Sequence, residues 1–177
     1  MKPHHHKRRN FKYGQAQHIV LSASLSVFSS ARIKQIIDSL LRKYSQYFGV
    51  TIYHRAIVGT HIHLILMARS DEGLSGFLRV ISGQVAVKLR AIKFIPRNIK
   101  QLWKNRPWSR VLTWGRNFTT ATRYVALNYL EGVGRLRRTH NRNELRQNTL
   151  LIDEILQKNL TKVVSSKPRP QLFLPFF

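Results

Sequence analysis

The sequence predicts an α+β domain whose first six elements follow the order strand, helix, strand, strand, helix, strand. Three observations lead to this class. Short stretches of alternating apolar and polar residues indicate strands, and longer stretches with apolar residues at helical spacing indicate helices. Glycine, serine or proline separates one stretch from the next. The resulting order is that of the ferredoxin-like βαββαβ sandwich.

The first three elements lead to a short turn. Residues 17–27 alternate and predict the first strand, and residues 33–48 predict the first helix, which Gly49 ends. Residues 50–58 are rich in β-branched and aromatic side chains and predict the second strand. The turn at residues 59–60 is so short that it predicts a hairpin with the next strand.

The remaining elements complete the pattern and extend it. They are a third strand over residues 60–67, a loop over 69–73, a helix over 74–94, a loop over 96–107, a fourth strand over 108–114, a third helix over 117–130 and a last helix near 144–158. The third helix is therefore an addition to the six-element fold. The predicted division is a basic arm over 1–14, a folded domain over 15–134 and a basic tail over 135–177.

The charge balance is the strongest signal in the composition. The chain has 177 residues, with 31 Lys and Arg against 7 Asp and Glu, which gives a formal net charge of +24. Such a field favours a polyanionic partner, nucleic acid first and an acidic membrane surface second. With so few carboxylates, a polymerase-like cluster of acids is not expected.

Several classes of protein are excluded. The chain has no cysteine, so it has no disulfide framework, thiolate metal site or cysteine nucleophile. No apolar stretch is long enough to span a membrane, and the basic N-terminus lacks the apolar core of a secretory signal. We therefore expect a cytoplasmic protein, without a membrane partner.

A pair of histidines is the first candidate for chemistry. His61 and His63 lie in the third predicted strand, where alternation puts both side chains on one face. Two neutral imidazoles at neighbouring positions on one face are suitable ligands for a single metal ion. Taken alone, the pair would equally fit two half-buried histidines on a sheet.

A tyrosine and an asparagine in the third predicted helix strengthen this hypothesis. Tyr124 and Asn128 are four residues apart and therefore share a helix face. If this helix covers the histidine face, the Asn128 carbonyl oxygen suits a Mg or Mn ion, and the Tyr124 phenol could attack a phosphodiester that the ion polarises. Tyr129 is a rival nucleophile that faces elsewhere on the helix. Asn128 could instead be a surface or capping residue.

These residues carry a resemblance to a known family. His61-Ile62-His63 resembles the histidine–hydrophobic–histidine (HUH) motif of single-tyrosine transposases, and Tyr124 to Asn128 resembles their nucleophile helix with its polar third ligand. The resemblance is closer still to the REP-associated tyrosine transposases. It covers residues 13–134 and includes three further sites: His18, Leu102-Trp103 and Trp114-Gly115.

The resemblance implies a function, a cofactor and a partner. Such enzymes cleave single-stranded DNA at hairpin-forming palindromes, with a divalent Mg or Mn ion, and leave a 5′-phosphotyrosine link and a free 3′-hydroxyl. The chain departs from the family where Gly59-Thr60 replaces Pro-Asn and where Tyr129 replaces Pro. Neither change removes a ligand. The resemblance also implies a prokaryotic, nucleoid-associated protein that is a monomer or a homodimer.

Basic and aromatic residues are candidates for DNA contact. The expected phosphate contacts are Arg79, Lys100, Lys104, Arg106, Arg116, Arg123, Arg135, Arg137 and Arg138. Three tryptophans could stack on bases, although we expect at least two of them to pack inside the fold: Trp103, Trp108 and Trp114. We expect His18 to be a core histidine rather than a ligand.

Two other functions fit parts of the sequence. A non-catalytic module that binds single-stranded nucleic acid or RNA hairpins would need the basic surface but not Tyr124. A basic ribosome-associated protein would explain the charge but would leave the histidine pair incidental. Only the enzyme requires a divalent ion between His61 and His63.

Overall fold

The computed structural model describes residues 13–137 and 141–165. The chain divides into two compact units, Met1–Arg135 and Leu136–Phe177, which are described separately. The predicted limits of the arm, the domain and the tail stay predictions. Among the described residues, no helix is long and apolar enough to cross a membrane.

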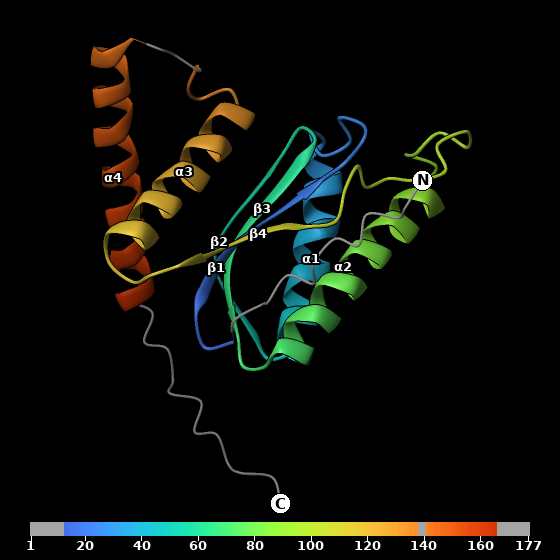
Figure 1. Cartoon of the computed structure of the whole chain (residues 1–177). Coiled ribbons are helices and arrows are strands. Elements are labelled where there is room, and N and C mark those ends of the chain that lie inside the picture. The colour runs from blue at the N-terminus through green and yellow to red at the C-terminus, as the bar shows by residue number, and fades with distance from the viewer. Residues whose placement is uncertain (1–12, 138–140, 166–177) are drawn as a thin grey trace, which may run out of the picture. The chain divides into compact units, whose positions relative to one another are not determined.

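The first unit has the predicted order of elements with one added helix (Figure 1). Its elements are β1 (Ala16–Ser22), α1 (Ala31–Tyr47), β2 (Val50–Val58), β3 (His61–Ala68), α2 (Asp71–Ala91), β4 (Trp108–Leu112) and α3 (Arg116–Gly132). The second unit contains α4 (Arg142–Ser165), which confirms a helix in the predicted region around residues 144–158.

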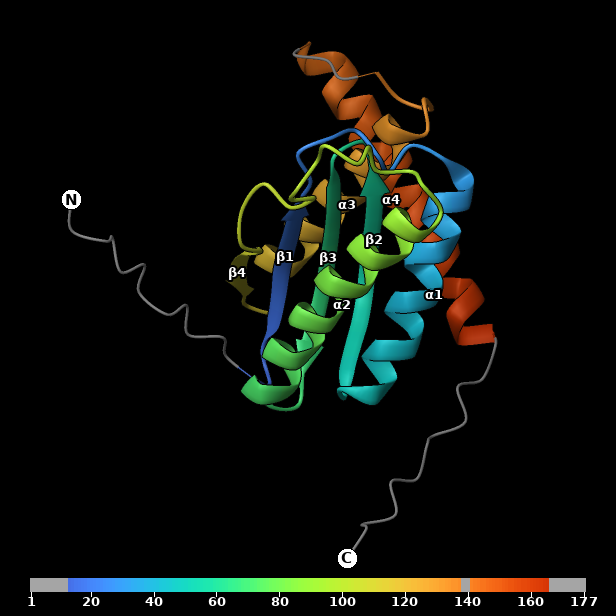
Figure 2. The ribbon, with the colours of Figure 1, turned by 90° about the vertical axis from the view of Figure 1, so that its right-hand side faces the viewer.

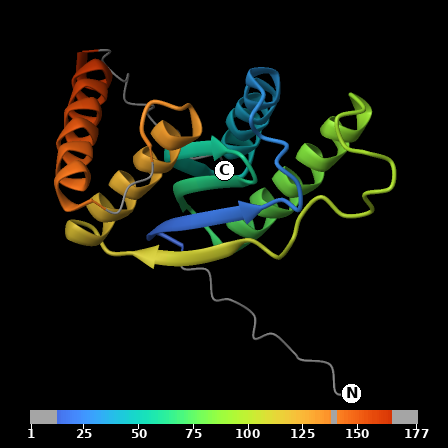
Figure 3. The same cartoon turned by 90° about the horizontal axis from the view of Figure 1, so that it is seen from above.

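The four strands form one antiparallel sheet in the order β2-β3-β1-β4 (Figure 2). This order confirms the ferredoxin-like fold class. The helices α1 and α2 lie on one face of the sheet, and α3 lies on the other (Figure 1). Figure 3 shows β4 beside β1 at the outer edge of the sheet.

Alternation along β3 divides the core between the two faces. Ile62, Leu64 and Leu66 are fully buried in the large cluster with α1 and α2. Ile65 points to the opposite face and joins a small cluster with Val125 of α3. The residues of β3 that share a face with Ile65 therefore lie on the side of the sheet that α3 covers.

The beginning of α2 differs from the prediction. We expected a loop over residues 69–73, but the helix begins at Asp71. The Ser70 hydroxyl accepts a hydrogen bond from the Gly73 backbone N–H at 2.9 Å, which caps the helix. Two acidic residues in the first turn favour the positive end of the helix dipole: Asp71 and Glu72.

The first and fourth strands are shorter than predicted. β1 ends at Ser22 rather than at residue 27, because Val27 and Phe28 leave the strand and are buried in the core with α1 and α2. β4 ends at Leu112, and Gly115 with a φ of 89° then turns the chain into α3. A positive φ of this size favours glycine at that position.

The close approach of α3 to β2 depends on Gly132, which gives a test of the packing. A Cβ atom at Gly132 would overlap the Val58 side chain, with its Cβ only 2.7 Å away. We expect Gly132→Ala to destabilise the domain by about 1–3 kcal/mol, since valine cannot move aside without straining the strand. Thermal or urea unfolding followed by circular dichroism measures this.

The matched control is Gly83→Ala in the exposed part of α2, where an added Cβ meets nothing within 4 Å. This variant is expected to be more stable by about 0.4–1 kcal/mol, because alanine restricts the unfolded chain. Equal stability changes for the two variants would contradict the close packing at Gly132.

Candidate active site

The histidine pair lies on the face of the sheet that α3 covers. His61 and His63 alternate with the buried Ile62, and the register places His63 opposite Ala56 of β2 and Val20 of β1. The imidazole of His63 is almost fully buried, whereas that of His61 is half-buried. The ring centroids of the two histidines are 5.8 Å apart, and Thr60 Oγ1 lies 2.8 Å from His61 Nδ1.

The nucleophile candidate lies next to these histidines. Val125 anchors α3 in the small core, and the preceding Tyr124 keeps 46% of its surface exposed. The Tyr124 ring centroid is 5.8 Å from that of His63 and 5.9 Å from that of His18, with edge-on geometry in both pairs. The structure therefore brings Tyr124 to the histidine face, with solvent access.

His18 of β1 belongs to the same group. We expected a core histidine at this position, and the side chain is buried, but its contact with His63 was not predicted. Its register partner on β3 is Ile65, so its side chain shares the face of His63. His18 Nε2 lies 3.4 Å from His63 Nδ1, and both side chains are buried. This contact occupies one nitrogen of His63 and leaves its Nε2 for other partners.

Burial keeps the imidazoles of His18 and His63 neutral. It is the main reason that the pKa of His63 falls to about 4, and the neighbouring His18 and His61 lower it further. The pKa of His18 also falls to about 4, mainly through burial and secondly through the charge of Arg110. At neutral pH each of these rings therefore keeps one unprotonated nitrogen, and this neutral form is the one that binds a metal ion.

Asn128 lies one turn after Tyr124, as predicted. Its Nδ2 donates a hydrogen bond to the Tyr124 backbone carbonyl at 2.8 Å, which leaves its carbonyl oxygen available as a ligand. Within the part of the chain that the structure describes, no three His, Cys, Asp or Glu side chains form a complete metal site. A metal ion at His61 and His63 would thus need other oxygen ligands, and an amide, water or a DNA phosphate suits Mg or Mn.

Tyr129, the rival nucleophile, is placed differently. It is similarly exposed, at 47%. No ring contact joins it to His61 or His63 among the described residues. Tyr129 is five residues after Tyr124, so the two side chains point to different faces of α3.

A protein family matches most of the first unit of the chain. The family described as "Transposase IS200 like" matches residues 12–128. The chain belongs to this transposase family. The resemblance drawn from His61-Ile62-His63 and Tyr124 is thereby confirmed at the level of the family, and the family places the chain among DNA-processing enzymes.

A solved structure shows the same fold, and a second is less similar. The structure of the REP-associated tyrosine transposase bound to a REP hairpin has a TM-score of 0.58 at 16% identity, over 74% of this chain and 75% of that chain. A transposase from Deinococcus radiodurans has a TM-score of 0.48 at 17% identity, over 70% of this chain and 98% of that chain. No curated protein matches the chain.

The predicted phosphate contacts of this transposase are spread over the fold. Lys104 lies beside the last residue of β1, which is opposite His61 of β3, because its backbone N–H donates to Ser22 O at 2.8 Å. Arg116 begins α3, and Arg123 precedes Tyr124. Arg79 is exposed on α2, on the opposite face of the sheet. Four further predictions are placed as follows: Lys100 and Arg106 in the loop before β4, Arg135 at the end of the first unit and Arg137 in the second unit. Arg138 lies outside the described residues.

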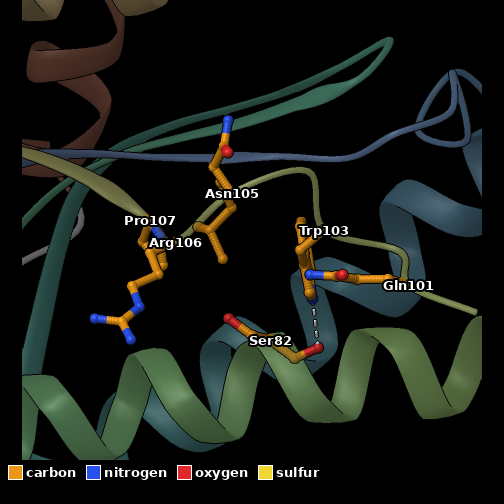
Figure 4. A pocket seen from close by; sticks show the side chains of 7 residues that line it. Ser82, Gln101, Trp103, Asn105, Arg106 and Pro107 are labelled. Carbon is orange, nitrogen blue, oxygen red and sulfur yellow. Dashed lines mark hydrogen bonds between the residues drawn. The ribbon is translucent and has the colours of Figure 1, made fainter. Parts of the chain in front are cut away.

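A small cavity lies beneath the loop before β4, on the side of α2 (Figure 4). Its volume is about 210 Å³. Trp103 forms one wall, and its Nε1–H donates to the Ser82 backbone carbonyl at 2.9 Å, while its ring packs on Phe28. The cavity is lined by Leu21, Ser82, Gln101, Trp103, Asn105, Arg106 and Pro107. None of the histidines or Tyr124 lines the cavity. The hydrogen bond to Ser82 and the packing on Phe28 indicate that Trp103 holds this loop in place.

The buried histidines also predict how stability depends on pH. In the folded domain His18 and His63 stay neutral down to about pH 4, whereas in the unfolded chain histidine takes up a proton near pH 6.5. The unfolded state then binds more protons, so we expect stability to fall as the pH falls from 6.5 towards 4. Each histidine contributes at most about 1.4 kcal/mol per pH unit.

Urea unfolding at a series of pH values, in a chelator that removes metal ions, measures this dependence. His18→Gln should reduce the slope between pH 6.5 and 4, because one of the two groups is gone. An unchanged slope in this variant would show that His18 protonates equally well in the folded and unfolded states.

Proposed function

We propose that this chain is a metal-dependent, single-tyrosine endonuclease and strand transferase that acts on single-stranded DNA at hairpin-forming palindromes. The observation that carries the proposal is the half-exposed Tyr124 phenol beside the buried, neutral His63, which lies next to His61 on the same face of the sheet. The proposed nucleophile and the two proposed imidazole ligands are thus close together, and the nucleophile is open to solvent, which supports a single-site phosphoryl transfer.

Tyr124 would perform the covalent step. Its phenolic oxygen attacks the phosphorus of a phosphodiester, and an O–P bond to the tyrosine forms while the bond from phosphorus to the 3′ oxygen breaks. The phenolic proton leaves to solvent, and the departing 3′ oxygen takes up a proton from water. The products are a 5′-phosphotyrosine and a free 3′-hydroxyl, and the reverse reaction with another 3′-hydroxyl transfers the strand.

Three residues would hold the ion. His61 and His63 would contribute imidazole nitrogens, and Asn128 would contribute its carbonyl oxygen. A divalent ion bound there would polarise the phosphate oxygens and favour nucleophilic attack. The residues fit a Mg or Mn ion that keeps water or phosphate as its remaining ligands, since only a few protein groups converge.

His18 would support this site without binding the ion. Histidine ligands of metals generally use their second ring nitrogen for a hydrogen bond that fixes the ring. The 3.4 Å contact between His18 Nε2 and His63 Nδ1 supplies such a partner. His63 would then bind the ion through Nε2, and the buried pair would hold the imidazole in one orientation.

Hairpin DNA is the proposed substrate. The net charge of +24 favours a nucleic acid, and the structural neighbour with the same fold is bound to a REP hairpin. The partial exposure of Tyr124, 46% of its surface, favours an unpaired strand, because the flexible backbone of a single strand can bend towards a tyrosine at the surface of the domain.

The decisive experiment is the formation of a covalent protein–DNA adduct. Purified protein is incubated with labelled single-stranded hairpin DNA and Mn²⁺, and the products are separated on a denaturing gel. We expect an adduct that protease removes and that fully double-stranded DNA does not give. DNA binding without any adduct would favour a non-catalytic nucleic-acid-binding module instead.

A further inference from the structure

The edge strand β4 presents an exposed tryptophan to the active-site face. Trp108 is opposite Val20 of β1, which is itself opposite His63, so the three side chains share one face. The indole ring meets the His18 ring edge-on, with centroids 5.5 Å apart, and Tyr124 meets the same imidazole at 5.9 Å. An indole that is 44% exposed thus lies one ring away from the proposed nucleophile.

The other two tryptophans already have structural partners. Trp103 donates a hydrogen bond to Ser82 and packs on Phe28. Trp114 stacks on Phe118 at 4.7 Å and meets Tyr53. Within residues 13–137 and 141–165, the indole nitrogen of Trp108 has no hydrogen-bond partner. Because this half-exposed ring also lies against His18 on the face of His63 and Tyr124, it is the tryptophan best placed to contact an external partner there.

Basic residues flank Trp108 along the same edge. Arg110, two residues on, is exposed and lies opposite His18. On the other side, Lys104 is held against Ser22, and Ser22 is opposite His61. Lys104, Trp108 and Arg110 therefore lie one after another alongside β1, next to Ser22, Val20 and His18 respectively. They form a row of a cation, an aromatic ring and a second cation.

This pattern is that of a surface for single-stranded nucleic acid. Such surfaces combine basic groups that contact successive phosphates with aromatic rings on which bases stack. We propose that Trp108 stacks on the unpaired base next to the scissile phosphate, and that Arg110 and Lys104 contact phosphates on either side. This inference rests on the proposed function and identifies the part of the surface that holds the substrate strand.

The test measures binding separately from chemistry. The Tyr124→Phe background and a chelator remove cleavage, and the probe is a DNA hairpin with oligothymidine flanks that carry one 2-aminopurine at successive positions. Stacking on an aromatic ring quenches 2-aminopurine fluorescence. We expect strong quenching at one position and, with Trp108→Ala, loss of that quenching together with about 5- to 100-fold weaker binding.

Two matched controls separate stacking from a folding defect. Trp108→Phe keeps an aromatic face and should restore most of the quenching, whereas Trp114→Ala removes a more exposed tryptophan from the cluster with Phe118 and should leave the quenching unchanged. Thermal unfolding shows that each variant is folded.

The phosphate contacts have their own measurement. Arg110→Gln and Lys104→Gln should each flatten the slope of log affinity against log salt by about 0.7. Arg42→Gln on α1, which is exposed on the opposite face of the sheet, should leave the slope unchanged. Equal slopes for Arg110→Gln and Arg42→Gln would refute the phosphate contact.

Failure of this inference can be told from failure of the proposed function. If wild-type protein forms the covalent adduct but Trp108→Ala binds and quenches like the parent, the stacking role is wrong and the enzyme stands. If no adduct forms but the Trp108 and Arg110 effects are found, the edge of β4 is a binding surface without Tyr124 chemistry.

Discussion

Tyr124→Phe is expected to abolish cleavage of single-stranded hairpin DNA and to leave DNA binding intact. The change removes only the hydroxyl, which is the group that would form the bond to phosphorus, so we expect a loss of at least roughly 1,000-fold in cleavage rate. The ring stays in place against His63 and His18, and the fold should be unaffected. Cleavage of labelled DNA with Mn²⁺ and binding by fluorescence anisotropy measure the two properties.

Tyr129→Phe is the matched control. Tyr129 lies on the same helix and is exposed to a similar extent, 47% against 46% for Tyr124, but within the described residues no ring contact joins it to His61 or His63. We expect this variant to cleave at the rate of the wild type. Normal cleavage by Tyr124→Phe together with loss of cleavage in Tyr129→Phe would transfer the role of nucleophile to Tyr129.

His61→Ala combined with His63→Ala is expected to abolish both Mn²⁺ binding at the site and cleavage. The variant removes both imidazole ligands, and the Asn128 oxygen alone cannot hold the ion in water. The affinity for single-stranded DNA in a chelator should be retained, because it rests on basic side chains elsewhere. Isothermal calorimetry with Mn²⁺ and the cleavage assay test the two expectations.

His4→Ala combined with His6→Ala is the control for spacing. These histidines have the same separation in the basic arm, and their removal should change neither the calorimetric signal of the site nor cleavage. Because His63 is buried, replacing both histidines is expected to cost some stability. The single variant His61→Ala, at a half-buried position, should stay folded and still bind Mn²⁺ more weakly than the wild type. Undiminished Mn²⁺ binding in a folded His61→Ala variant would refute His61 as a ligand.

The sequence by itself determined the features that depend only on residues close together along the chain. The strand over Val50–Val58 has the predicted limits, because β-branched residues and a flanking glycine act locally. The common face of His61 and His63 follows from the period of two along any strand. The placement of Asn128 one turn after Tyr124 follows in the same way from the period of a helix. Periodicity also predicted the order of elements along the chain, which the structure confirms.

The start of α2 and the end of β1 required more than periodicity. The residues Ser70 to Gly73 are typical of a loop in composition, yet the Ser70 cap makes them the first turn of a helix. In β1, the apolar residues beyond Ser22 continue the alternating pattern, but Val27 and Phe28 fill the core from a loop. Packing decided both limits.

Only the tertiary structure decided which residues join the site. His18 lies 45 positions before His63 in the chain, and the register of β1 against β3 is what brings their nitrogens within 3.4 Å. Trp108 and Arg110 reach the same face through the register of β4 on β1, and Tyr124 reaches it because α3 packs on that side. Strand register and helix placement arise from contacts between residues distant in sequence, which no local spacing records.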